Sequence, residues 1–392
     1  MKLCVYAHPF DLQALAGHGG LARLRDLGIG EVALATSYHD GRWLMPWHPG
    51  GVVRFLEDGC VHFRPRGDYG QLQPRVSSSV PATGPSPLER LAQEATRTGT
   101  AVRAWTVFTH NSRLGEAHPQ QCVQNAFGDL YRYALCPAQP AVRQYTAAMV
   151  RDLAAHDVQT IELEALGQMG FKHSSHHDKA SFTPSGLLDA ALSACFCDAC
   201  SASMAAAGAD PERLQAAVVA FVQTQVRDGD AMAPTKVPAA PAELAASGLD
   251  TGWLAAVLAT RACTLQELGA AVVDATPRTA RAVQVHPNPW FTGSQLSLDT
   301  AAVAFPASDE RVLTCYGDGP DAIAKMLASP GLAAVPHRRV CLWPKAPQFG
   351  SDDDLARVRD LCQRAGVATI AIYHLGLLPW RTLERAAKML SA

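Results

Sequence analysis

Short runs of apolar, β-branched residues alternate along the chain with longer segments of helical periodicity. This alternation is typical of βα units arranged around a parallel sheet. Eight runs predict strands, over residues 2–7, 31–36, 101–108, 160–166, 281–286, 312–316, 339–343 and 368–373. Helices are predicted between most of them, over residues 15–27, 87–98, 141–155, 320–328, 352–365 and 380–390. Eight such units predict an α/β protein with a (β/α)8 TIM barrel.

A doubly wound open sheet is the competing architecture, but no G-x-G-x-x-G motif follows the first strand.

Two segments are longer than an ordinary connection. Residues 37–86, with a possible hairpin over 52–63, predict a long loop over the barrel mouth after strand two. Residues 167–280 predict an insertion after strand four that carries a cysteine cluster and a helical subdomain. We expect residues 1–392 to form a single barrel around these two additions.

The composition narrows the class of protein. The chain has 392 residues, 48% of them hydrophobic, and 34 Lys and Arg against 36 Asp and Glu. It is too apolar for a disordered chain and lacks the basic excess of a nucleic-acid binder. No signal peptide and no membrane-spanning run is recognised, so we expect a cytoplasmic location, with no membrane partner. The 11 cysteines are then reduced thiols, and a homo-oligomer stays possible.

The most specific local pattern is a C-x-C-x-x-C motif formed by Cys195, Cys197 and Cys200. This spacing brings three thiolates within reach of one tetrahedral metal ion. Cys136 is the first choice for a fourth ligand and Cys122 the second. Four thiolates would leave no open position for water, so the pattern predicts a structural zinc and no catalytic metal. Cysteines packed without a metal are the alternative, and no organic cofactor is expected.

Two glutamates alternate with apolar residues in the fourth predicted strand. Glu162 and Glu164 share one face, and Ile161 and Leu163 share the other. Because the outer face of a barrel packs against helices, both carboxylates are expected to point inward near the carboxyl end of the strand. Their repulsion should raise the pKa of at least one and prepare it to donate a proton. The alternative is a structural network in which an inward Lys or Arg neutralises the pair.

Polar and aromatic residues recur where the predicted strands end. Such groups can bind the hydroxyls and the apolar face of a sugar. The expected substrate-binding residues are His8, His39, His110, Asn111, His173, His177, His286, Asn288, Tyr316, Trp343, Lys345 and Tyr373. A metal-dependent isomerase or hydrolase that uses the loop from His173 to His177 is a further hypothesis.

The cysteine motif, together with the earlier Cys136-Pro137-x-x-Pro140-x-x-Arg143, resembles the zinc-binding cluster of glycoside hydrolase family 42, the β-galactosidase-like enzymes. The resemblance covers roughly residues 100–205. It implies a (β/α)8 hydrolase with a strand-four general acid/base, a position that Glu164 occupies, although Leu163 replaces the usual Asn. It also implies a strand-seven nucleophile, but residues 342–345 contain no carboxylate.

The spacing of Glu162 and Glu164 also resembles the strand-four acids of family 18 chitinases, and Tyr316-Gly317-Asp318 resembles their Tyr-Asp pair. This second resemblance implies that Glu162 orients a substrate acetamido group. Asp318 is otherwise the second carboxylate of a two-acid mechanism. We therefore expect a glycoside hydrolase that acts on a small glycoside or oligosaccharide, with Glu164 as general acid/base. The alternative is a non-hydrolytic carbohydrate-binding barrel.

Overall fold

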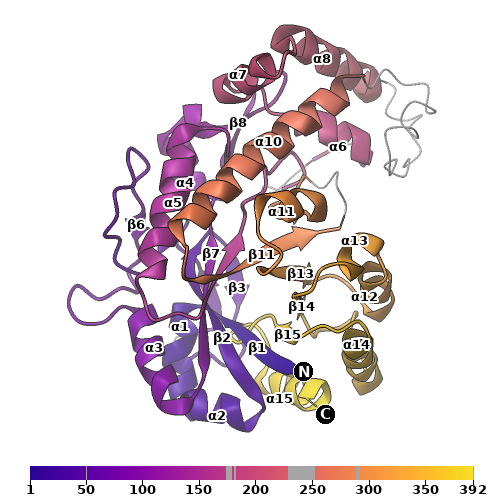
Figure 1. Cartoon of the computed structure of the whole chain (residues 1–392). Coiled ribbons are helices and arrows are strands. Elements are labelled where there is room, and N and C mark those ends of the chain that lie inside the picture. The colour runs from indigo at the N-terminus through magenta and orange to yellow at the C-terminus, as the bar shows by residue number, and fades with distance from the viewer. Residues whose placement is uncertain (50, 174–178, 181, 228–251, 288–291, 392) are drawn as a thin grey trace.

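The computed structural model describes residues 1–49, 51–173, 179–180, 182–227, 252–287 and 292–391. Eight parallel strands form a closed barrel, because β1 pairs with both β2 and β15. The predicted (β/α)8 TIM barrel is confirmed, and each of the eight predicted strands is present (Figure 1). Their bounds are β1 (Lys2–Ala7), β2 (Ile29–Tyr38), β7 (Ala101–Val107), β10 (Thr160–Glu164), β11 (Ala280–His286), β13 (Glu310–Cys315), β14 (Arg338–Leu342) and β15 (Thr369–Ile372).

Helices surround the barrel and pack on its outer face. Five follow the predicted ranges closely: α3 (Pro87–Thr98), α5 (Pro140–Ala154), α12 (Pro320–Leu327), α14 (Asp352–Arg364) and α15 (Trp380–Ser391). The single helix expected over residues 15–27 is instead two, α1 (Pro9–Ala16) and α2 (Gly20–Asp26), because Gly19 takes a left-handed φ of 95° between them. Short helices α11 (Leu298–Ala304) and α13 (Pro330–Ala333) complete the ring, whereas α4 (Ser112–Ala117) lies in the connection after β7 and packs on β9 (Leu130–Leu135).

The long loop after β2 forms a small hairpin, but not where the sequence predicted one. β3 (Arg42–Leu44) pairs with β4 (Val53–Phe55), whereas β5 (Cys60–Val61) pairs with the end of β2 and with β6 (Arg75–Val76). The hairpin expected within residues 52–63 is therefore wrong. The pairing of β4 with β3 has a physical reason. It buries Trp43 of β3, which contacts the rings of His8 and Tyr38.

The insertion after β10 is a helical subdomain with its own apolar core. α6 (Gly186–Leu192), α7 (Asp198–Ala206) and α8 (Pro211–Arg227) surround that core, which includes Leu188, Val218 and Phe221. The long helix α10 (Gly252–Ala275) contributes Trp253 to it and then runs down beside the barrel (Figure 1).

The lower half of α10 belongs to the barrel. Its Leu268 and Val272 lie in the main core between the sheet and the surrounding helices. α10 is therefore the helix that connects the fourth and fifth barrel strands, and the subdomain is built on its upper half. Among the described residues it is the one helix long and apolar enough to cross a membrane by length and composition, a test that core helices also pass.

Candidate active site

The barrel interior holds a charged layer in which two arginines join three glutamates. Arg103 lies 3.3 Å from Glu31, 3.4 Å from Glu162 and 2.7 Å from Glu310. Arg339 lies 2.6 Å from Glu31 and 3.0 Å from Glu310. Burial alone would raise the pKa of Glu31, but the two guanidinium groups hold it at about 2. These ion pairs neutralise one fully buried carboxylate, Glu162, and two that are mostly buried, Glu31 and Glu310.

Glu162 belongs to this layer and not to an open site. Its carboxylate is fully buried and accepts hydrogen bonds from the Tyr6 hydroxyl and from Gln284 Nε2, the latter at 3.0 Å. Since its oxygens already have partners and no solvent path, it does not fit the expected role of orienting a substrate acetamido group. The structural network, with Arg103 as its inward cation, describes Glu162 better.

Removing one cation from the layer is expected to destabilise the barrel. Arg103→Met should lower the free energy of unfolding by about 3–5 kcal/mol, because Glu162 would stay buried without its guanidinium partner. Urea unfolding followed by circular dichroism measures this loss. Arg143→Met is the control, since Arg143 pairs with Glu267 in a partly exposed bridge worth less than about 1 kcal/mol. Equal effects in the two variants would contradict a special role for the layer.

Glu164 lies two residues after Glu162, at the carboxyl end of β10, as the alternation predicted. It is partly exposed. Its Oε2 accepts hydrogen bonds from the indole N–H of Trp105 and from Gln284 Nε2, the latter at 3.1 Å. Burial, and to a smaller extent the charge of Glu162, raise its pKa to about 7 against the opposing effect of the two hydrogen bonds. A carboxyl group with such a pKa can hold a proton at neutral pH and donate it to a bound substrate.

The backbone directly after Glu164 fixes its position. Ala165 takes a left-handed φ of 56°, which is unusual for a residue with a Cβ. Its carbonyl accepts hydrogen bonds from the amide and the hydroxyl of Thr109, at 3.0 and 2.5 Å. Unusual backbone conformations held by their surroundings cluster at functional sites. The turn thus ends β10 with Glu164 at the mouth of the barrel.

Three tyrosines lie near Glu164, and its charge affects their pKa values. The negative charge of Glu164, added to burial, raises the pKa values of Tyr38, Tyr316 and Tyr373. Tyr38 and Tyr373 share a hydrogen bond of 3.1 Å between their hydroxyls. The Tyr316 ring lies 4.3 Å from that of Tyr373, and its buried hydroxyl faces the Cys341 thiol, where it opposes the rise in the pKa of that thiol.

Trp343 extends this aromatic wall. Its ring lies 5.5 Å from that of Tyr373, and the ammonium of Lys345 lies 3.1 Å above it. The sequence-based choice of Tyr316, Trp343, Lys345 and Tyr373 thus names residues that the fold brings together. Flat rings beside a protonated carboxyl group suit a ligand that presents both C–H faces and hydroxyls.

Three histidines from three loops meet at another part of the mouth. The rings of His39 and His110 stack at 4.2 Å, and His173 Nε2 lies 3.1 Å from His110 Nδ1. Burial lowers the pKa of all three, and that of His173 falls to about 4. They are therefore neutral near pH 7. Neutral imidazoles provide one donor and one acceptor each, which suits hydroxyl binding.

The other predicted mouth residues have different surroundings. Asn111 is buried and caps α4, so its amide is already used by the fold. His286 is the last residue of β11 and is half-buried. His8 is buried, stacks on Phe10 at 4.1 Å and contacts the Trp43 ring. His177 and Asn288 lie outside the described residues.

No contact between Asp318 and Glu164 is found among the described residues. Asp318 lies in the turn after β13, where its charge raises the pKa of Cys315. The Cys315 thiol lies in the core outside the barrel, 3.8 Å from Met326 of α12. The groups that shift the pKa of Glu164 do not include Asp318. The structure therefore offers no support for Asp318 as the second carboxylate opposite Glu164.

The four cysteines expected to bind metal come together in a buried cluster. The Cys136 sulfur lies 3.8 Å from that of Cys195 and 3.6 Å from those of Cys197 and Cys200. All four sulfurs lie within 4.8 Å of one another, and none forms a disulfide. Cys136, and not Cys122, is the fourth member.

These distances fit a tetrahedral zinc ion. Zn–S bonds of about 2.3 Å place the sulfurs about 3.8 Å apart. Gln168 Nε2 lies 3.8 Å from the Cys136 sulfur, and the backbone N–H of Gln124 donates to the Cys195 sulfur at 3.4 Å. Both are expected of groups that orient thiolate ligands. The cluster joins the loop after β10 to the hairpin of β8 (Cys122–Gln124) and β9 (Leu130–Leu135), which also pairs with His110. A metal here would fix the loops that carry His110 and His173.

Sequence reasoning missed the two residues that hold Glu164. Trp105 and Gln284 lie on β7 and β11, the two strands that flank β10. Strand alternation was the available signal, because both positions share the inward parity of Arg103 and Ala282 on their own strands. Tyr6, which bonds Glu162 from β1, could have been found in the same way.

Solved structures with this fold include several enzymes that act on sugars. The catalytic domain of β-amylase from Paenibacillus polymyxa has a TM-score of 0.57 and 10% identity, over 100% of this chain and 98% of that one. The β-galactosidase from Marinomonas ef1 has a TM-score of 0.54 and 12% identity, over 100% and 59%. The α-L-fucosidase isoenzyme 2 from Paenibacillus thiaminolyticus has a TM-score of 0.51 and 11% identity, over 100% and 49%. At these identities the comparison shows a shared fold, and this chain spans about half the length of the latter two proteins. No family model and no curated protein matches the sequence.

Proposed function

We propose that the protein is a glycoside hydrolase in which Glu164 is the general acid/base. The observation that carries this proposal is a partly exposed carboxyl group with a pKa of about 7, at the carboxyl end of a barrel strand. Active sites of TIM barrels lie at this end. The names of the structural neighbours, which describe enzymes acting on sugars, support the same class.

In the proposed reaction Glu164 donates its proton to the glycosidic oxygen as the bond to the leaving group breaks. Trp105 and Gln284 hold the carboxyl group in place and stabilise the carboxylate that results. The Tyr373 and Trp343 rings face the sugar. The Glu164 carboxylate left by this step then serves as base: it takes a proton from the water molecule whose oxygen forms the new bond to the anomeric carbon.

The rate is expected to fall as pH rises through about 7. Glu164 is an acid only while protonated, and burial sets its pKa at about 7. Initial rates of the proposed hydrolysis should therefore be near their maximum below pH 7 and fall about tenfold per unit well above it. A rate that continues to rise from pH 6 to pH 9 would contradict this role.

A screen of aryl glycosides, including galactosides and N-acetylhexosaminides, tests the function. We expect the purified protein to release the aryl group from at least one of them, and Glu164→Gln to release it about 10²–10⁴-fold more slowly. Full turnover by Glu164→Gln would exclude Glu164 as the acid.

A carbohydrate-binding protein without turnover is the second candidate. One observation favours it. Glycoside hydrolysis ordinarily uses two carboxylates, but among the described residues the one carboxylate that affects the pKa of Glu164 is Glu162, which is fully buried. Calorimetry distinguishes the two candidates. Sugar binding of equal affinity in wild type and Glu164→Gln, with no release from any glycoside, would favour the binding protein.

We also propose that Cys136, Cys195, Cys197 and Cys200 bind a structural zinc ion. The sulfur separations and the burial of all four support it. Zinc there would hold the loops after the third and fourth strands together and take no part in proton transfer, since four thiolates fill its coordination sphere.

A further inference from the structure

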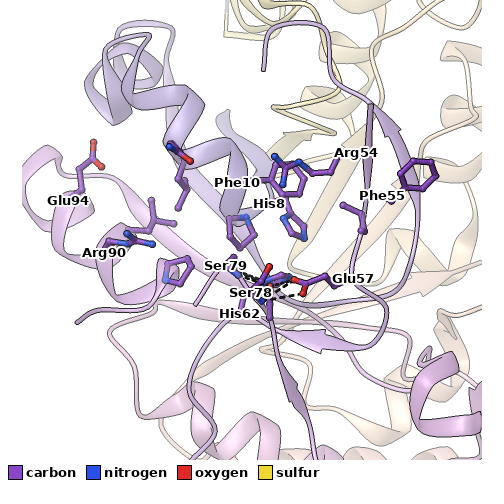
Figure 2. A pocket seen from close by; sticks show the side chains of 17 residues that line it. His8, Phe10, Arg54, Phe55, Glu57, His62, Ser78, Ser79, Arg90 and Glu94 are labelled. Atoms are coloured by element: carbon purple, nitrogen blue, oxygen red, sulfur yellow. Dashed lines mark hydrogen bonds between the residues drawn. The ribbon is translucent and has the colours of Figure 1, made fainter. Parts of the chain in front are cut away.

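A second pocket lies beside the barrel mouth and contains none of the proposed catalytic residues (Figure 2). Its volume is about 700 Å³, within the range of about 300–1,000 Å³ that is usual for small-molecule sites. It is formed by α1, α3, the β4 strand and residues 56–79. His8 lies between the pocket and the barrel mouth. Its ring is 4.5 Å from that of His62, which lines the pocket, and 6.0 Å from that of Tyr38 at the mouth.

Two arginines supply the positive charge of this pocket. Arg54 comes from β4, and its guanidinium lies 4.4 Å above the Phe10 ring; Arg90 comes from α3, on another side of the pocket (Figure 2). Within the described part of the chain, neither guanidinium has a carboxylate at ion-pair distance. Their N–H donors therefore face the pocket without an internal acceptor, although Arg residues in folded proteins normally pair with oxygen atoms.

The two carboxylates that line the pocket are used by the fold. Glu57 accepts hydrogen bonds from the Ser77 hydroxyl at 2.5 Å and from the Ser78 amide at 3.1 and 3.2 Å. Glu94 accepts one from the Leu21 amide at 3.1 Å. Both oxygens of Glu57 and one oxygen of Glu94 thus accept internal hydrogen bonds, whereas among the described residues no internal acceptor is found for either arginine.

The remaining polar groups add neutral hydrogen-bonding capacity. Burial lowers the pKa of His62 to about 4, so its imidazole is neutral, and its Nδ1 lies 2.9 Å from the Ser79 hydroxyl. Burial also lowers the pKa of His8, whose buried Nδ1 has no hydrogen-bond partner among the described residues. The two guanidinium groups are therefore the charged donors of the pocket, and guanidinium donors bind oxyanions.

We propose that this pocket binds a small organic oxyanion whose phosphate or carboxylate groups pair with Arg54 and Arg90. Guanidinium groups bind both oxyanions through paired N–H donors. The Phe10 ring and the Ser79 hydroxyl would contact the body of the ligand, which suits a polyhydroxylated molecule such as an acidic sugar. This site does not depend on the proposed hydrolase activity.

Calorimetry at low ionic strength tests the proposal with three probes: inorganic phosphate, D-glucuronate and the neutral control D-glucose. We expect wild type to bind at least one of the two anions more tightly than glucose. The anion preferred, phosphate or glucuronate, identifies the group that the natural ligand carries. Using Glu164→Gln protein for parallel titrations keeps the result independent of any hydrolysis.

Two variants and a matched control locate the binding. Arg54→Gln and Arg90→Gln should each weaken anion binding about tenfold or more, which is the effect of losing a charge-assisted hydrogen bond. Arg97→Gln, an exposed arginine on the same helix as Arg90 but outside the pocket, should bind as wild type does. The proposal is overturned if wild type binds neither anion at millimolar concentration, or if Arg90→Gln and Arg97→Gln bind equally. Arg90 is itself exposed, so its substitution tests binding without a risk to folding.

Discussion

Replacing Glu164 by glutamine is expected to lower kcat for the proposed glycosidase by about 10²–10⁴-fold, the usual contribution of a general acid. Glutamine keeps the shape and one oxygen that can accept from Trp105 or Gln284, but it cannot donate a proton to a leaving group. The loss should be smallest for aryl glycosides with acidic phenols, because good leaving groups need little protonation. Initial rates on a series of such phenols measure this trend.

The same variant should be more stable than wild type above pH 7. Folding raises the pKa of Glu164 from its ordinary value of 4.5 to about 7. Between these two pH values the unfolded chain loses the proton first, so the wild-type free energy of unfolding falls as pH rises and stays low above pH 7. Glutamine carries no charge, and Glu164→Gln should gain on the order of 1–3 kcal/mol at pH 8 and little at pH 4.

A matched variant separates catalysis from folding. Glu116→Gln removes an exposed carboxylate from α4. It should change neither kcat nor the unfolding midpoint. If Glu164→Gln loses activity and stability together at pH 8, its effect is structural and the assignment of Glu164 as the acid fails.

Substituting Cys197 by serine is expected to remove a bound zinc ion and destabilise the protein strongly. Cys197 is the N-cap residue of α7, where the helix N-terminus favours a thiolate, and its sulfur lies 3.6 Å from that of Cys136. Metal binding contributes directly to the free energy of folding, so a loss above about 4 kcal/mol is expected. Metal analysis by mass spectrometry and thermal unfolding measure the two effects.

Two other cysteines provide controls for this experiment. Cys122→Ala should keep the zinc, because Cys122 is buried near the cluster but its thiol contacts the carbonyl of Gly115. Cys263→Ser should be silent, since Cys263 is exposed on α10. Purified wild type with far less than one zinc per chain, or Cys197→Ser with wild-type metal content, would contradict the zinc site.

The sequence by itself determined the barrel and the content of its most specific motif. Strand and helix periods are set by neighbours within a few residues, so all eight strands could be identified from local patterns. The inward parity of Glu162 and Glu164 follows from the two-residue repeat of a strand and is correct. The C-x-C-x-x-C spacing is equally local, and it placed three of the four clustered sulfurs.

Only the tertiary structure decided what these groups do. Glu162 and Glu164 are two residues apart, yet Arg103 from β7 pairs with the first while Trp105, two residues further along β7, binds the second. Arg54 and Arg90 reach one pocket from a short strand and a helix that share no periodic signal. The physical reason is that charge pairing, burial and pKa depend on distances through space, which closure of the barrel sets between segments far apart in the chain.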